Sequence, residues 1–264
     1  MADGDRVQVV IANNKVSMKE KRNMNRFVAK VLFTVGACLA SGAPLWAQDT
    51  GVIKGKIVFK GDPAAYSRVE IDTSKDPNCG KDGKKIGTEN VVLNKKTTPV
   101  TVRNVLVSIK EGLGDRKYTA PTDKVVLDQK GCHYEPHVLA LMEGQPLTIR
   151  NSDDTNHNIH FLPKVNEEVN VTQPQKGMEK DVKLVKEDVF KVKCDVHPWM
   201  GCHIAVFTHP FFFVTKEEGT FELKNVPPGK YKVEAWHETF GTLSMDVEVA
   251  TGATVEKDLT FEPK

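Results

Sequence analysis

Sulfur and nitrogen groups that bind soft metal ions lie close together in one short segment of the sequence. Cys194, His197 and Met200 follow the pattern Cys-x-x-His-x-x-Met, and His157 offers a second imidazole upstream. A cysteine thiolate, two histidine nitrogens and a weak methionine sulfur form the ligand set of a blue-copper electron-transfer site. The residue types and their spacing therefore predict that these four residues bind one copper ion, which would alternate between Cu(I) and Cu(II).

Three residues near this motif are second-choice metal ligands, here called the reserve ligands. His160 lies two residues after His157, so on a strand the two side chains point to opposite faces and only one should face the metal. Cys202 and His203 directly follow Met200 and could compete for the ion.

Other chemistries fit the segment less well. A zinc site could use the thiols and imidazoles between Cys194 and His203, but the usual paired spacing is missing and Met200 would have no role. Covalent haem attachment requires Cys-x-x-Cys-His, which the sequence lacks. A cysteine nucleophile is disfavoured because Asp195 beside Cys194 does not stabilise a thiolate in the absence of a metal. We therefore expect a metal-binding protein that is not an enzyme.

The motif lies between segments that alternate apolar and polar residues, as strands do. Val189 to Cys194 leads into the ligand loop, Ile204 to Phe207 leaves it, and His157 to Leu162 carries the other imidazole. Many short alternating segments separated by turn residues indicate an all-β protein built as a β-sandwich.

The same reasoning organises the remainder of the chain. Gly51 to Gly61 and Val100 to Ile109 alternate and are expected to be strands, and residues 72–88 form a loop that carries Cys79. Pro163 to Lys186 is expected to be a long polar connection between two strands. Pro228-Gly229 suits the central pair of a type II turn between two strands, because glycine accepts a positive φ.

From about Leu127 to Val214 the sequence resembles the cupredoxin family, the small blue-copper proteins. The segment around His157 is similar to the family's segment with the first histidine ligand, and Cys194 to Gly201 resembles its carboxy-terminal ligand loop in the short version found in amicyanin. The resemblance implies that His157, Cys194, His197 and Met200 bind copper. It also implies a Greek-key β-sandwich.

Gly219 to Tyr231 resembles the carboxypeptidase-regulatory-like (transthyretin-like) β-sandwich module, over about residues 215–262. That module begins with strands like those predicted before residue 110. We therefore expect an all-β chain with two sandwiches, in which the copper domain (124–214) is inserted into a transthyretin-like sandwich made of residues 51–123 and 215–264.

Residues 1–47 are predicted to be an N-terminal extension and signal peptide. Lys19 to Lys30 is basic, Val31 to Ala40 is apolar, and Trp46-Ala47-Gln48 offers a cleavage point. The apolar run is shorter than the roughly 20 residues of a membrane-spanning helix, so the mature chain should not span a membrane. Lipid attachment at Cys38 ranks second. A periplasmic or extracellular location follows.

An oxidising compartment permits disulfides. If Cys194 binds copper, Cys79 and Cys132 are the favoured pair, because both lie in turns outside the metal motif. A pairing of Cys202 with either of them remains open.

The formal net charge is only +2, which argues against nucleic acid as a main partner. We expect a redox partner protein, such as a cytochrome or an oxidoreductase, that meets the imidazole edge of His197 through an apolar patch at Pro198 and Trp199. Copper storage or delivery is one alternative function, and a non-redox binding module on the transthyretin-like scaffold is another.

Overall fold

The computed structural model describes residues 50–81 and 85–263. The expected extension and signal peptide (1–47), including Cys38, therefore lie outside the described residues. Within these ranges the chain forms strands, one short 3-10 helix, η2 (Pro63–Tyr66), and no α-helix. None of the described segments is a helix long and apolar enough to cross a membrane. The all-β fold class predicted from the sequence is confirmed.

One sandwich, here called the split sandwich, is made of strands from both ends of the described chain. Its first sheet has the order β15-β1-β3-β2, with β18 and β19 also paired to β1, and its second sheet has the order β14-β4-β16-β17. The bounds are β1 (Gly51–Phe59), β2 (Leu93–Asn94), β3 (Thr101–Val102), β4 (Leu106–Glu111), β14 (Phe212–Val214), β15 (Thr220–Val226), β16 (Gly229–His237), β17 (Gly241–Val249), β18 (Thr254–Glu256) and β19 (Leu259–Phe261).

Strand β1 is the element that joins the two ends of the split sandwich. It pairs antiparallel with β15 and β3 along one edge and parallel with β18 and β19 along the other. Every second residue of β1 is buried, as its alternating sequence predicts. A Cβ atom on Gly55 would lie 1.9 Å from the carbonyl oxygen of Lys257, so only glycine permits this close approach of the two segments.

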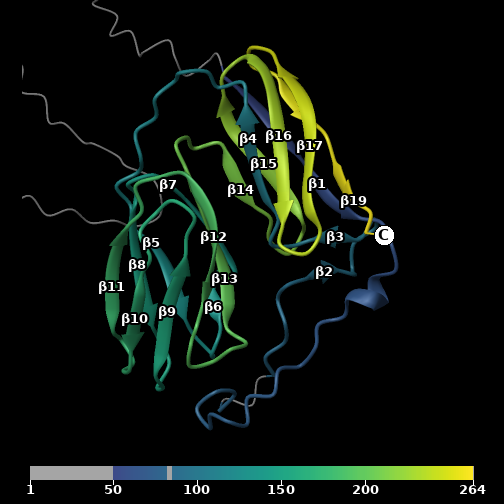
Figure 1. Ribbon diagram of the computed structural model, residues 1–264. Coiled ribbons are helices and arrows are strands. Elements are labelled where there is room, and N and C mark those ends of the chain that lie inside the picture. The colour runs from purple at the N-terminus through teal and green to yellow at the C-terminus, as the bar shows by residue number, and fades with distance from the viewer. Residues whose placement is uncertain (1–49, 82–84, 264) are drawn as a thin grey trace, which may run out of the picture. The chain divides into compact units, whose positions relative to one another are not determined.

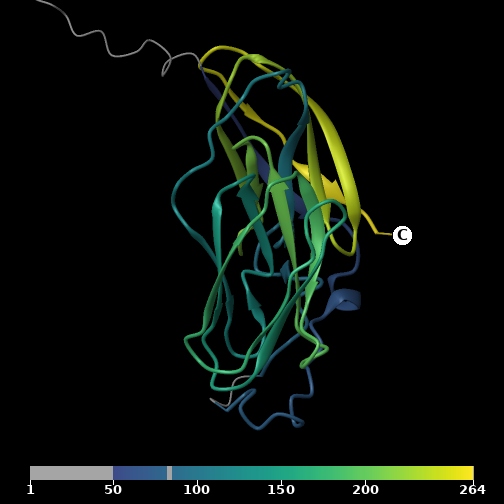
Figure 2. The same ribbon diagram turned by 60° about the vertical axis from the view of Figure 1, so that its left-hand side comes forward.

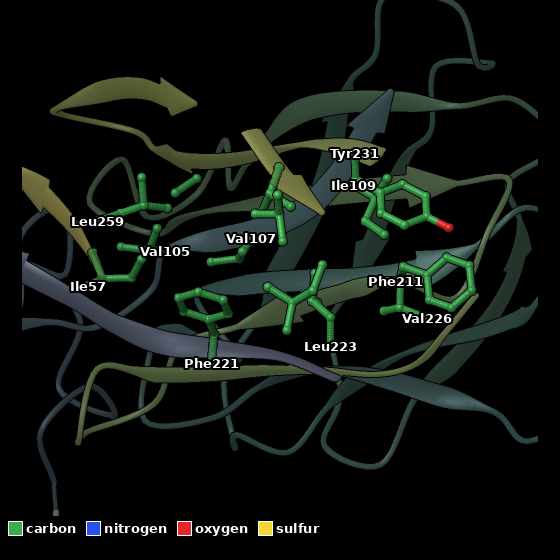
Figure 3. Close-up of a cluster of buried hydrophobic side chains, with 14 of the residues drawn as sticks. Ile57, Val105, Val107, Ile109, Phe211, Phe221, Leu223, Val226, Tyr231 and Leu259 are labelled. Carbon is green, nitrogen blue, oxygen red and sulfur yellow. The ribbon is translucent and has the colours of Figure 1, made fainter. Parts of the chain in front are cut away.

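The core of the split sandwich is apolar and draws on both sheets. Ile57 from β1, Leu259 from β19 and Phe221 from β15 face residues of the second sheet such as Val107 and Tyr231 (Figure 3). Because these residues come from both sides of the central block, neither end of the chain can complete this core alone.

The second sandwich, here called the central sandwich, is contiguous in sequence. Its sheets have the orders β10-β9-β12-β13-β7 and β11-β8-β5-β6. The bounds are β5 (Val125–Gln129), β6 (Tyr134–Glu135), β7 (Val138–Met142), β8 (Pro146–Asn151), β9 (His157–Leu162), β10 (Asn170–Gln173), β11 (Glu179–Lys183), β12 (Asp188–Lys193) and β13 (Gly201–Phe207). These strands form the teal and green block in Figure 1.

A small apolar cluster joins the two sandwiches. Leu106 of β4 packs with Val138, Ala205 and Phe207, which come from β7 and β13 of the central sandwich. The partly buried ring of Trp236 lies against the same cluster. The two sandwiches therefore share buried surface.

Two local expectations were wrong. Pro163 to Lys186 is not only a loop, since β10 and β11 lie within it and pair with β9 and β8. Pro228-Gly229 does not form a type II turn, because Gly229 lacks the positive φ that this turn requires. The strands on its two sides belong to different sheets, so the segment is an arch between sheets.

A long loop connects β1 to β2 and reaches the far end of the central sandwich. Its residues 67–81, here called the capping loop, run away from the split sandwich in both ribbon views (Figures 1 and 2). A disulfide between Cys79 and Cys132 fastens the capping loop to the segment between β5 and β6. This is the pairing that the sequence favoured.

Candidate metal centre

The ligand motif occupies the turn between β12 and β13. Lys193 pairs with Gly201 at the strand ends, so Cys194 to Met200 forms the connecting loop. Two backbone hydrogen bonds hold this loop in a compact turn: the Met200 N–H donates to the carbonyl of His197 (2.9 Å), and the Cys194 N–H donates to that of Met200 (3.2 Å). His157 begins β9, the neighbour of β12, and so reaches the same end of the sheet.

Three of the expected ligands converge on one buried point. The Nδ1 atoms of His157 and His197 lie 3.1 Å apart, and the Cys194 sulfur lies 4.0 Å from Nδ1 of His197. All three residues are almost completely buried. Two nitrogens that bind one ion at distances of about 2.0 Å lie about 3.3 Å apart at a tetrahedral angle. The spacing of the two imidazoles therefore fits a shared metal ion, and the mixed thiolate and imidazole donors suit copper.

Met200 closes the loop next to these ligands. It is 1% exposed and belongs to the same buried cluster as Cys194. Its backbone is fixed by the two hydrogen bonds of the turn, so its thioether is confined to the interior. This position suits a weak thioether ligand beside the three donors.

The environment of Cys194 favours the thiolate that a copper site needs. Burial alone would raise the pKa of the Cys194 thiol, but hydrogen bonds outweigh it and lower the pKa. The donors include the His157 ring and the backbone N–H groups of His197 (3.3 Å) and Asn158 (3.4 Å). Hydrogen bonds to the sulfur also tune the reduction potential of such a site.

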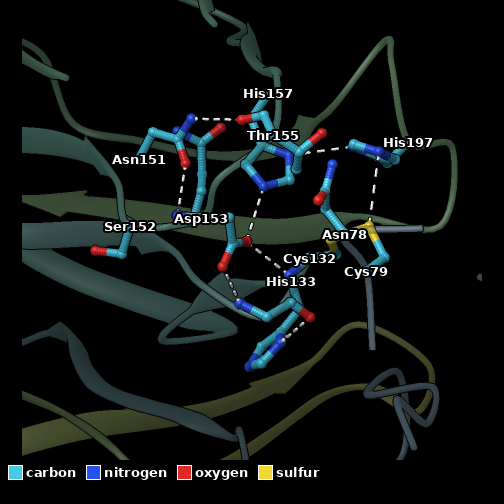
Figure 4. Close-up of polar contacts among 12 residues, drawn as sticks. Asn78, Cys79, Cys132, His133, Asn151, Ser152, Asp153, Thr155, His157 and His197 are labelled. Carbon is cyan, nitrogen blue, oxygen red and sulfur yellow. Dashed lines mark hydrogen bonds and ion pairs between the residues drawn. A yellow bond between two sulfur atoms is a disulfide. The ribbon is translucent and has the colours of Figure 1, made fainter. Parts of the chain in front are cut away.

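A carboxylate contacts Nε2 of each of the two histidines. Nε2 of His157 lies 2.8 Å from Oδ2 of Asp153, and Nε2 of His197 lies 2.9 Å from Oδ2 of Asp76 (the first contact is drawn in Figure 4). A carboxylate on Nε2 fixes the ring orientation and leaves Nδ1 free to bind a metal. Asp153 also accepts the backbone N–H of Cys132 at 2.8 Å, which ties this carboxylate to the disulfide.

These contacts shift the pKa values of the supporting groups. Burial alone would raise the pKa of Asp76, but hydrogen bonds from Thr155, the Asn78 backbone and His197 lower it to about 2. Burial would likewise lower the pKa of His157, but its contacts with Asp153 and Cys194 raise it. The carboxylates are therefore ionised at neutral pH, where they can orient the rings.

The capping loop covers the edge of His197, contrary to expectation. The sequence predicted that this imidazole edge would face a partner protein, yet His197 is only 3% exposed. Asp76 and Cys79 lie against it, with the Cys79 sulfur 3.7 Å from Nε2. Pro198 remains exposed and Trp199 partly exposed, with the Trp199 ring centroid 5.0 Å from that of His197.

The reserve ligands lie elsewhere. His160 points away from the site and contacts Asp195 (2.8 Å) and Glu168 (2.9 Å). Cys202 is buried in the core as a free thiol and belongs to none of the metal-compatible groups among the described residues. His203 belongs to a separate group with His137.

The supporting residues Asp76 and Asp153 were missed by sequence reasoning. Asp153 precedes His157 by four residues, within a loop rich in hydrogen-bonding side chains, which is a local signal that could have been used. Asp76 lies 121 residues before His197, and nothing in the local sequence connects the two.

One family model matches part of the chain. It is described as the second beta sandwich domain of a BOS complex subunit NOMO1-like protein, and it matches residues 212–261, within the split sandwich. No curated protein matches the chain.

Several solved structures of copper proteins are similar to part of the chain. A Cu(I) form of an amicyanin variant is 22% identical over 38% of this chain and 97% of its own, with a TM-score of 0.29. A purple cupredoxin from Nitrosopumilus maritimus is 22% identical over 31% of this chain and 97% of its own (TM-score 0.27). A Cu-containing nitrite reductase from Thermus scotoductus is 19% identical over 39% of this chain and 25% of its own (TM-score 0.29).

Proposed function

We propose that the central sandwich is a cupredoxin-type domain that binds one copper ion through His157, Cys194, His197 and Met200 and carries single electrons between proteins. The observation that carries the proposal is the convergence of two Nδ1 atoms and one thiol sulfur at a buried point. When bound, copper would supply one-electron redox chemistry through its Cu(I) and Cu(II) states.

The protein's part is to hold its ligands still and to exclude water. Asp153 and Asp76 orient the two rings, and backbone N–H groups of Asn158 and His197 stabilise the Cys194 sulfur. The ligand loop is held between paired strands of one sheet. Such a rigid, buried site supports electron transfer more than substrate binding, so we propose that the protein is not an enzyme.

We further propose an oxidising compartment, periplasmic or extracellular, and a partner protein that docks near the ligand loop. The disulfide supports the compartment, because disulfides persist outside reducing cytosol. Pro198 and Val196 are exposed beside the site, and Trp199 contacts His197. This small apolar surface suits the weak, transient encounters of redox proteins such as a cytochrome or an oxidoreductase. The split sandwich would act as a transthyretin-like module that supports the copper domain.

The test is the addition of Cu(II) to the purified metal-free protein. We expect an intense visible thiolate-to-copper band and a reversible redox wave. The band should disappear in Cys194→Ser and persist in the matched variant Cys202→Ser, which alters the other free cysteine.

Two results would count against the proposal. The absence of the band in the wild-type protein, or its survival in Cys194→Ser, would exclude thiolate-bound copper. Rapid transfer of copper to a chelator without a redox wave would favour a delivery function. The burial of all three converging ligands argues for slow release.

A further inference from the structure

A second group of metal-compatible side chains lies apart from the copper ligands. His137 precedes β7, His203 lies on β13, and Glu238 follows β16, so the group combines both sandwiches. One ligand atom from each of these residues lies within 4.8 Å of the others. The backbone holds two of them together, since the His203 N–H donates to the carbonyl of His137 at 2.9 Å.

The Glu238 carboxylate lies between the two imidazoles. Its Oε1 contacts Nε2 of His137, and its Oε2 lies 3.8 Å from Nδ1 of His203. The second distance is too long for a hydrogen bond. It is close to the separation of two atoms that bind the same ion. Glu89 adds a second carboxylate, 3.9 Å from Nδ1 of His137.

Two buried ring nitrogens in this group have no hydrogen-bond partner. They are Nδ1 of His137, whose side chain is 8% exposed, and Nδ1 of His203. A buried polar atom without a partner destabilises the fold, so native proteins rarely retain one without a purpose. Nδ1 of His203 faces a Glu238 oxygen at 3.8 Å, where a cation would bridge them.

The charges of the group also favour a cation. Two carboxylates, Glu238 and Glu89, lie beside the two imidazoles. Lys191 pairs with His203 across the strands, and its side chain is exposed to solvent.

We propose that His137, His203 and Glu238 form a second metal site, which binds a divalent zinc or copper ion. Two imidazoles and a carboxylate are a known ligand set for Zn²⁺, and imidazole also suits Cu²⁺. The site contains no sulfur, because Cys202 points to the opposite face of β13 from His203 and lies in the core.

This second site is distinct from the first and has an entry path. Met200 and His203 are three residues apart on an extended segment, which corresponds to roughly 10 Å. His137, His203 and Glu238 line a cavity of about 660 Å³, whose wall also contains the exposed side chains of Lys191 and Pro198. A hydrated ion can therefore reach the group from solvent.

The test measures Zn²⁺ binding in a full-length protein whose first site is disabled by Cys194→Ser and His157→Gln. This variant should bind one equivalent of Zn²⁺ in a competition with a chromophoric chelator. Adding either Glu238→Gln or His203→Phe should weaken binding more than about 100-fold, the upper end of the loss caused by removing an outer-shell partner. The matched control is His160→Gln, which removes a histidine outside both sites and should leave the affinity unchanged.

Binding of no Zn²⁺ by the disabled variant, or an affinity that Glu238→Gln and His203→Phe leave unchanged, would overturn the proposal. Circular dichroism of each metal-free variant checks that it folds. If His203→Phe does not fold, Glu238→Gln, which preserves side-chain volume, decides the matter. The outcome is independent of the proposed copper function because the first site is absent throughout.

Discussion

At the scale of single residues, the two histidines of the candidate copper site are supported unequally. Asp153 lies on the same domain, four residues before His157, whereas Asp76 reaches His197 from the capping loop. The ring of His197 therefore depends on a segment outside the central sandwich. Removing either carboxylate should loosen a ring without removing a ligand.

Asp76→Asn tests this dependence. The variant loses the ionised acceptor that holds Nε2 of His197, so copper affinity should fall by about 10–100-fold. The measurement is a chelator competition that follows the thiolate-to-copper band. The control Asp72→Asn removes an exposed carboxylate of the same loop, which is hydrogen-bonded to the nearby Ser74. An equal loss in both variants would show that the contact with His197 is unimportant.

Asp188 gives a pH-dependent prediction far from the metal ligands. Its Oδ2 accepts the backbone N–H groups of Lys164 and Val165, each at 3.0 Å, at the start of β12. Burial alone would raise the pKa of Asp188, but these hydrogen bonds lower it below 3.8. Its stabilising effect is therefore complete above pH 3.8 and is lost as the pH falls through the lowered value.

Asp188→Asn should reduce the free energy of unfolding at pH 7 by about 1–2 kcal/mol, because the loop keeps an acceptor but loses its charge. Urea unfolding at pH 7 and at a series of acidic pH values measures the difference. The gap between wild type and variant should shrink as the pH falls through the lowered pKa of Asp188, because its carboxyl group then becomes neutral. A gap that stays constant would show that the charge of Asp188 contributes nothing.

At the scale of elements, the capping loop is the feature that distinguishes this site from a simple loop between two strands. The disulfide between Cys79 and Cys132 holds that loop over His197. Both cysteines of the disulfide contact residues of the candidate site. The Cys132 N–H donates to Asp153, which orients His157, and the Cys79 sulfur contacts the His197 ring. The disulfide therefore links stability and metal retention.

Replacing Cys79 and Cys132 together by serine should have both effects. Their sequence separation is 53 residues, and the chain-entropy relation gives a loss of about 4 kcal/mol for a loop of that length. Copper should also pass to a chelator faster, because the loop that carries Asp76 is no longer fastened. Guanidinium unfolding and stopped-flow chelation are the two measurements.

The control is Cys202→Ala, which changes a buried cysteine outside the disulfide and the ligand group. It should leave the chelation rate unchanged. Equal chelation rates in the oxidised wild type and the double serine variant would show that the capping loop does not retain the metal.

At the scale of the whole molecule, local alternation predicted strands with one buried face but not the partners of their side chains. β1 and β12 alternate clearly because one face of each is buried. β11 was missed because nearly all of its residues are exposed on a sheet edge, where no alternation of burial marks the strand. The sequence motif likewise predicted the three converging ligands.

The contacts that the sequence did not reveal join residues far apart in the chain. His197 and Asp76 are separated by 121 residues, and His137 and Glu238 by 101. Such pairs form only after the capping loop or the split sandwich packs against the central sandwich, and no local spacing encodes them. The covering of His197 and the second group of ligands could therefore be found only in three dimensions.

The pairing of β1 with the last strands of the chain has a kinetic consequence. The Lys56 N–H donates to Asp258, 202 residues later, whereas the central sandwich closes within residues 125–207. Long loops close slowly and local contacts form first. The central sandwich should therefore fold first, before β1 pairs with β18 and β19.

Pulse-labelled hydrogen exchange during refolding of the oxidised, metal-free protein can follow this order. Amides of β12 and β13 should gain protection before those of β1 and β19, and simultaneous protection would contradict the expected sequence of events. A strand that must await residues 254–261 is exposed to intermolecular pairing in the interval. The pairing that completes the sheet in the native state thus makes a growing chain vulnerable to aggregation until those residues have been made.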